Sequence, residues 1–254
     1  MPPGLRMFSL AHLAIICMVP GLAALLVIAH RAQLPGHRFT RYVLALLTTA
    51  ASISLYAYFA ATGAPMFPNH IPLELCDASL WLIVASLLTL NRAIFDIAYY
   101  WAIAGATQSL FTPNLVNPTP FLSIQFFVDH GLIVCSTLYL VWSGQLRPRP
   151  GSVARSLIAA NIYALVIGTF DFAFQTNYMF LRNKPPTPSL LDYLGPWPLY
   201  ILTGEFVALA LFLLIYLPFR RQRPSIPFPS SLPPNLKQKA TSQSASSSSL
   251  IPDP

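Results

Sequence analysis

Long apolar segments, separated by short polar connections, run through the first 220 residues of the chain. A bilayer core about 30 Å thick needs about 20 apolar residues of helix to cross it. Seven segments come close to that length: 8–30, 42–62, 73–90, 93–111, 121–143, 156–176 and 197–219. The pattern therefore predicts an all-α, polytopic transmembrane helix bundle with about seven spans in residues 1–220.

The basic residues are distributed unevenly among the connections. Twelve of the 15 Lys and Arg residues lie after the first, third, fifth and seventh segments, and only three lie in the alternate connections. Cytoplasmic loops are enriched in Lys and Arg, so we expect the N-terminus outside and the C-terminus in the cytoplasm. The first apolar run exceeds the roughly 7–15 residues of a signal-peptide core, so we expect it to be a membrane helix.

The last part of the sequence, residues 221–254, is rich in Pro and Ser. Such a composition cannot bury enough apolar area to offset the entropy lost on ordering. We expect these residues to form a disordered cytoplasmic tail.

The composition excludes several classes of protein. The chain is 55% hydrophobic and 9% charged, whereas soluble domains carry about 25% charged residues. Its net charge of +7 comes from residues between apolar segments, not from one basic face, so a nucleic-acid partner is not expected. Zinc, nucleotide and P-loop motifs do not occur, so we expect no cofactor and no metal. Membrane lipids are the expected partners.

Ionisable side chains lie within segments where they are costly. Six of the eight carboxylates fall inside the predicted spans, and such groups avoid lipid. When alternate spans run in opposite directions, most polar residues of the spans fall in the outer half. We expect one polar pocket there, formed by His12, Glu74, Asp77, Gln108, Asp129, Asp171, Asn177 and Glu205. Asp96 lies at the inner end, and its spacing predicts an ion pair with Arg92. Taken singly, each polar residue could instead be a structural hydrogen-bond partner.

Of the three cysteines, Cys76 has the surroundings of a reactive group. Pro72 predicts a helix start just before it, and a helix N-terminus favours a thiolate, although neighbouring Glu74 and Asp77 oppose it. His130 is the imidazole expected at a matching depth. A thiol and an imidazole supply the nucleophile and the base of acyl transfer, so Cys76 and His130 are the candidate catalytic residues.

Several blocks of sequence carry a family resemblance. They are 71–77 (IPLELCD), 100–101 (YW) with Gly105, Gln108 and Pro113, 126–131 (FFVDHG), 177–185 (NYMFLRNKP), 189–192 (SLLD) and 195–200 (GPWPLY). On these blocks the chain resembles the YwaF-like integral membrane proteins of bacteria and, more distantly, the eukaryotic transmembrane protein 164 family. The resemblance implies a multi-pass fold in a bacterial cytoplasmic membrane. Through the eukaryotic relative it implies a phospholipid acyltransferase whose Cys and His match Cys76 and His130.

Three functions stay open at this point. The first is an acyltransferase or acylhydrolase that acts on a phospholipid through Cys76 and His130. The second is a transporter or proton-coupled carrier that uses the buried carboxylates. The third is a non-catalytic membrane scaffold. The proline-rich connection 177–198 is either a stiff lid over the outer mouth or a plain interfacial connector.

Overall fold

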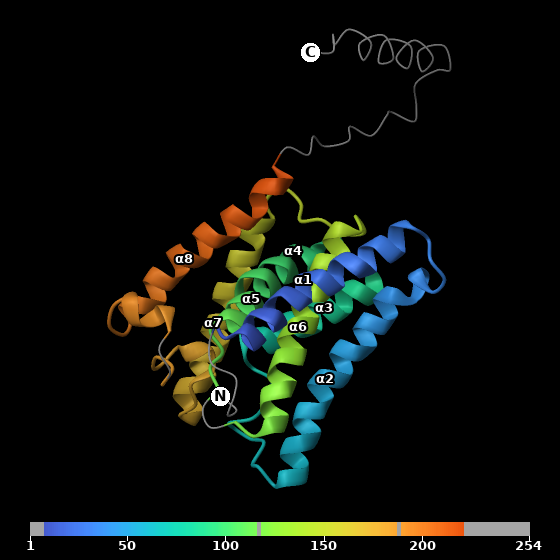
Figure 1. The fold of residues 1–254 in the computed structure, drawn as a ribbon. Helices are drawn as coiled ribbons and strands as arrows, with labels where there is room; N and C mark the ends of the chain where they lie inside the picture. The colour runs from blue at the N-terminus through green and yellow to red at the C-terminus, as the bar shows by residue number, and fades with distance from the viewer. Residues whose placement is uncertain (1–7, 116–117, 187–188, 221–254) are drawn as a thin grey trace. The chain divides into compact units, whose positions relative to one another are not determined.

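The computed structural model describes residues 8–115, 118–186 and 189–220, and in these residues it contains helices and loops but no strand (Figure 1). The predicted tail, 221–254, lies outside the described residues. The α-helices are α1 (Leu10–Arg31), α2 (Thr40–Thr62), α3 (Leu75–Thr89), α4 (Arg92–Tyr100), α5 (Thr107–Phe111), α6 (Pro120–Trp142), α7 (Ser152–Phe174) and α8 (Leu199–Tyr216). Shorter turns are η1 (His37–Phe39), η2 (Trp101–Ala106), η3 (Tyr178–Phe180), η4 (Leu190–Tyr193) and η5 (Leu217–Phe219).

Every apolar segment expected from the sequence is helical. Five helices are long and apolar enough to cross a membrane: α1, α2 with η1, α6, α7, and α8 with η5. Helix α3 has 15 residues, about 22 Å of helix. The fourth expected segment consists of α4, η2 and α5 in succession. The all-helical membrane fold is confirmed, whereas seven crossings and their orientation remain predictions.

The fourth segment contains a feature that its sequence does not predict. Residues Trp101–Ala106 form a π-helical turn between α4 and α5. Turns of this kind are rare and occur frequently at functional sites. Gly105 lies in this turn, and a Cβ atom added to it would be 4.0 Å from Leu75 Cδ2. The wide turn therefore packs directly against the beginning of α3.

Arginines close the C-terminal ends of two helices at one end of the bundle, which we call the basic end. Arg31, at the end of α1, donates to Trp142 O of α6 at 2.8 Å. Arg41, at the start of α2, donates to Leu87 O of α3 at 3.0 Å. A cation at a helix C-terminus satisfies free carbonyls and interacts favourably with the helix dipole. Because the end of α1 leads through a short connection into the start of α2, these bonds place the ends of α3 and α6 at the same end of the bundle.

Asp96 does not form the predicted ion pair with Arg92. It is fully buried on α4 and binds Arg149 and Arg155 instead. Arg149 Nε donates to Asp96 Oδ2 at 2.8 Å, and Arg155 Nη2 donates to the same oxygen at 2.7 Å. The Arg149 backbone N–H donates to Oδ1 at 2.9 Å. Helix α4 packs against α7, which brings the α6–α7 connection over Asp96. A local i,i+4 rule cannot anticipate these distant partners.

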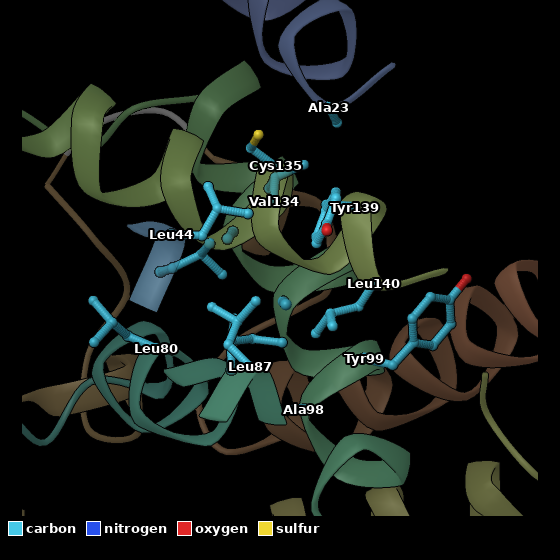
Figure 2. Close-up of a cluster of buried hydrophobic side chains, with 14 of the residues drawn as sticks. Ala23, Leu44, Leu80, Leu87, Ala98, Tyr99, Val134, Cys135, Tyr139 and Leu140 are labelled. Carbon is cyan, nitrogen blue, oxygen red and sulfur yellow. The ribbon is translucent and has the colours of Figure 1, made fainter. Parts of the chain in front are cut away.

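The core lies where α3, α4 and α6 meet. Leu80 and Leu87 of α3, Ala98 of α4, and Tyr139 and Leu140 of α6 are almost completely buried there (Figure 2). In the most apolar stretch of α6, 61% of the residues are buried, whereas in the corresponding stretches of α7 and α8 the buried fraction is 11%. Large apolar side chains such as Leu165 and Phe206 are exposed on α7 and α8. Helix α6 is therefore central, and α7 and α8 present apolar faces suited to lipid.

Candidate functional site

Helix α3 begins at Leu75, three residues after Pro72. Glu74 is the N-cap, and Asp77 Oδ2 accepts a hydrogen bond from the Glu74 backbone N–H at 3.1 Å as part of a capping box. The prediction that Pro72 opens the helix is therefore wrong, because the carboxylates at 74 and 77 cap the helix further along. Cys76 is the second helical residue, so it still lies in the first turn of α3.

Cys76 is half-buried as a residue, and its thiol lies among polar groups. Its Sγ is 3.8 Å from the hydroxyl of Ser109 on α5. The Ser109 hydroxyl also lies 3.3 Å from Gly105 O of the π-helical turn, to which it donates. Cys17 is exposed on α1, and Cys135 is buried in the core. Of the three cysteines, Cys76 is thus the one that lies in the first turn of a helix beside a side-chain hydroxyl.

Acidic groups surround this thiol. Tyr56 of α2 donates to Asp77 Oδ1 at 3.3 Å. Asp129 of α6 lies within electrostatic reach of both Asp77 and Cys76. Asp129 Oδ1 is buried and has no hydrogen-bond partner among the described residues. Side chains of α2, α3 and α6 therefore meet here in what we call the acidic cluster: Tyr56, Glu74, Cys76, Asp77 and Asp129.

His130 follows Asp129 on α6 and is buried. Its Nδ1 is 2.8 Å from Phe126 O. A carbonyl oxygen only accepts hydrogen bonds, so Nδ1 carries the proton and Nε2 keeps its lone pair. Within the described residues no hydrogen bond joins His130 to Cys76, although α3 and α6 pack against each other.

A short connection after α7, residues 176–181, is tied to the start of α3, and we call it the strap. The Met179 backbone N–H donates to Glu74 Oε2 at 2.9 Å. The hydroxyl of Tyr178 donates to Pro68 O at 2.8 Å and accepts from Ile71 N–H at 3.2 Å. Burial raises the pKa of Tyr178, so its hydroxyl stays protonated. The strap therefore fixes the segment that leads into α3.

Asp171 and Asn177 hold the strap in shape. Asp171 is fully buried at the end of α7, and its Oδ1 accepts from Thr176 Oγ1 at 2.6 Å and from Tyr178 N–H at 3.0 Å. Asn177 Oδ1 accepts from the backbone N–H groups of Arg182 and Asn183 at 3.0 and 2.9 Å. Both residues act on the backbone of the connection, and Asp171 reaches the acidic cluster electrostatically through Glu74.

The remaining predicted residues lie elsewhere. His12 is fully buried, with Nδ1 accepting from Phe8 N–H at 2.9 Å and Nε2 donating to Leu110 O at 2.8 Å. Both its ring nitrogens are used, so it joins α1 to α5. Gln108 and Glu205 line a different cavity, beside α7 and α8. The eight residues predicted for the pocket, together with Cys76 and His130, therefore do not share one pocket. Gln108 lies next to Ser109 in sequence, but consecutive helical residues point about 100° apart, so Ser109 contacts the Cys76 thiol and Gln108 lines the other cavity.

A scan against protein-family models matches residues 6–216 to the TMEM164 family. The chain belongs to the TMEM164 family. A search of curated proteins and a search of solved structures gave no match. The family match supports the expected resemblance to the transmembrane protein 164 family and does not support the YwaF-like name. Together with its apolar helices, it identifies the chain as a membrane protein of the TMEM164 family.

The sequence patterns do not single out three residues that lie at or near the acidic cluster: Tyr56, Ser109 and Tyr178. Each contributes a hydroxyl to the acidic cluster, to the thiol or to the segment before α3. Tyr and Ser are common in apolar helices and connections, so they carry no pattern of their own. Among the described residues no group of three or more His, Cys, Asp or Glu side chains could hold a metal ion.

Proposed function

We propose that this TMEM164-family protein transfers or hydrolyses the acyl group of a membrane phospholipid through a thioester on Cys76. The observation that carries the proposal is the position of Cys76. Of the three cysteines, it is the partly exposed one in the first turn of a helix, beside a hydroxyl and an acidic cluster. The resemblance of the 71–77 and 126–131 blocks to a phospholipid acyltransferase supports the same chemistry.

The helix lengths support His130 as the base. Helices α3 and α6 end together at the basic end. Counted back from those ends, Cys76 and His130 lie at similar levels, about 20 Å and about 18 Å along their helices at 1.5 Å per residue. Asp129, the neighbour of His130, is within electrostatic reach of Cys76. Because Nδ1 carries the proton, His130 Nε2 has a lone pair with which it can accept a proton from the thiol.

The chemical steps follow from these groups. His130 Nε2 takes the proton of the Cys76 thiol, and the sulfur attacks the ester carbonyl carbon of the phospholipid. The bond from that carbon to the glycerol oxygen breaks, and this oxygen takes the proton from His130, which leaves a thioester and a lysophospholipid. An acceptor hydroxyl, or water in hydrolysis, then gives its proton to Nε2 and attacks the thioester carbonyl carbon. The carbon–sulfur bond breaks, and the sulfur takes the proton back from Nε2, which restores the Cys76 thiol.

We also propose seven crossings with the basic end in the cytoplasm. The ends of α1, α3 and α6 and the start of α2 meet at the basic end through Arg31 and Arg41. Arg149 and Arg155 bind Asp96 near the start of α4. Alternating helix directions and the enrichment of arginine at one end fit this topology. Cysteine-accessibility labelling in intact cells, at single sites in the α1–α2 and α2–α3 connections, tests it.

The decisive experiment is an acyl-transfer assay with the purified full chain in liposomes that contain a phospholipid with a labelled acyl chain. We expect labelled product from the wild type and from Cys17→Ala, and at least a hundredfold less from Cys76→Ala. His130→Gln should lose a comparable amount, because thiol activation depends on the base. Equal product from wild type and Cys76→Ala would exclude the proposed chemistry.

A proton or ion path is the second candidate, and one observation favours it. Asp129 Oδ1 and Asp171 Oδ2 are buried and have no hydrogen-bond partner among the described residues, and unpaired intramembrane carboxylates mark such paths. Flux in proteoliposomes that falls in Asp129→Asn but not in Cys76→Ala would support it. A scaffold would show neither flux nor transfer.

A further inference from the structure

A cavity beside α8 is separate from the acidic cluster. It has a volume of about 260 Å3 and lies between η2, α7, α8 and the connection that includes the strap. We infer that this cavity binds a hydrocarbon chain of a lipid, and that small residues on its walls set how much of the chain it holds. Its relation to Cys76 rests on the proposed function, whereas chain binding does not.

The length of the cavity fits a hydrocarbon chain. Its wall on α8 extends from Tyr200 to Phe212, which is about 18 Å at 1.5 Å per residue. An elongated cavity of this length, lined mostly by aliphatic and aromatic side chains, suits a hydrocarbon chain that lies along α8.

Small side chains leave this space open. Ala160 and Ala164 lie one turn apart on α7, and Gly204 and Ala208 lie one turn apart on α8. Residues four apart share a helix face. A Cβ atom added to Gly204 would be 4.0 Å from Leu194 Cδ1, an ordinary contact. Because these residues line the cavity, larger side chains at these positions would take up part of its space.

The two ends of the cavity differ. Toward the basic end, Tyr100, Trp101 and Phe212 form an aromatic wall, with 4.9 Å between the ring centroids of Tyr100 and Phe212. The other end is lined by residues of the strap and by Gln108. Leu75 borders the cavity there and directly precedes Cys76. A chain with its tip at the aromatic wall would have its carboxyl end on the side of the thiol.

The lining chemistry selects the ligand. Gln108 and Glu205 provide the amide and carboxylate groups of the lining, and Glu205 Oε2 is already bonded to Asn161 at 2.9 Å. The rest is aliphatic and aromatic, a surface that gives ordered water few partners. The flanking helices α7 and α8 expose apolar residues suited to lipid. A hydrocarbon chain is the ligand that such a surface stabilises.

Photo-crosslinking tests chain binding without any requirement for catalysis. The full chain is reconstituted in liposomes with a phospholipid that carries a diazirine in the middle of one acyl chain. A parallel sample receives a free fatty acid with the same group. After irradiation, mass spectrometry maps the modified residues. We expect modification of cavity residues on α7 and α8, at least fivefold reduced in Ala164→Leu/Ala208→Leu and unchanged in the matched control Ala210→Leu, whose position is exposed.

A milder variant, Gly204→Ala, separates loss of cavity space from loss of folding. It should reduce modification about twofold with an unchanged melting temperature. Modification in the phospholipid sample alone assigns the site to a lipid-borne chain, and modification in both samples extends it to free fatty acids. Labels confined to outward-facing residues, or equal cavity labelling in all variants, would overturn the inference. Cys76→Ala should keep the cavity label, so failure of the thioester chemistry leaves this result separate.

Discussion

The two ends of the bundle differ in whether their buried carboxylates have ion-pair partners. At the basic end Asp96 is fully buried and bonded by two guanidinium groups and a backbone N–H. At the acidic cluster no described Lys or Arg forms an ion pair with Asp77 or Asp129, and Asp129 Oδ1 lacks a hydrogen-bond partner there. Satisfied charges hold a structure in one arrangement, whereas unsatisfied ones persist at functional sites. The comparison predicts a structural role for the ion pairs of Asp96, and it supports the proposed chemistry at the acidic cluster.

The largest expected effect comes from removing both partners of Asp96. Arg149→Ala/Arg155→Ala leaves a fully buried carboxylate with a single backbone donor. Breaking a buried pair from one side costs about 3–5 kcal/mol of unfolding free energy. Denaturant unfolding in detergent measures the loss, with Arg38→Ala, an exposed arginine of the α1–α2 connection, as the control. A loss below about 1 kcal/mol would remove the structural role of this end.

The next effect tests the link between the strap and α3. Glu74→Ala removes the carboxylate that accepts from the Met179 N–H, and a hydrogen bond to a charged group contributes about 1.5–3 kcal/mol. We expect a loss in that range and faster hydrogen exchange at the Met179 amide. Glu74→Gln keeps an acceptor and should lose less than half as much. Unchanged exchange in Glu74→Ala would contradict the link.

Tyr178→Phe should have a smaller effect. It removes the hydroxyl that joins Pro68 O and Ile71 N–H, at a cost of about 1 kcal/mol for a neutral hydrogen bond. Tyr193 is 87% exposed, so Tyr193→Phe is a matched control that should stay within about 0.5 kcal/mol of wild type. Thermal unfolding of the two variants side by side measures the difference, and equal melting temperatures would contradict this role.

The smallest effect on stability is expected at Asp129, in contrast to Asp96. Its Oδ1 has no partner among the described residues, and Asp77 lies within electrostatic reach. Asp129→Asn removes a charge from an acidic neighbourhood at almost constant volume. We expect the free energy of unfolding to change by less than about 0.5 kcal/mol or to rise. A loss above about 2 kcal/mol in denaturant unfolding would erase the distinction between the two ends.

Sequence patterns predict the helices well because apolar length is a local property. They fail where a contact depends on distant segments. The partners of Asp96 come from the α6–α7 connection and the start of α7. The strap, which follows α7 in the chain, bonds to Glu74, and both nitrogens of His12 are bonded to backbone groups. Residues at the same depth in the membrane lie close together only when their helix faces point toward each other. For this reason Gln108 and Glu205 line the chain-sized cavity and not the acidic cluster.

The most direct test of the central claim is the mass of the protein during turnover. Wild-type protein incubated with phospholipid and quenched in acid should carry one acyl group, located on the peptide that contains Cys76 and released by hydroxylamine. Cys76→Ala should carry none, and Cys17→Ala should resemble wild type. An acyl group found on another residue, or a Cys76 peptide that stays unmodified while labelled product accumulates, would contradict the account.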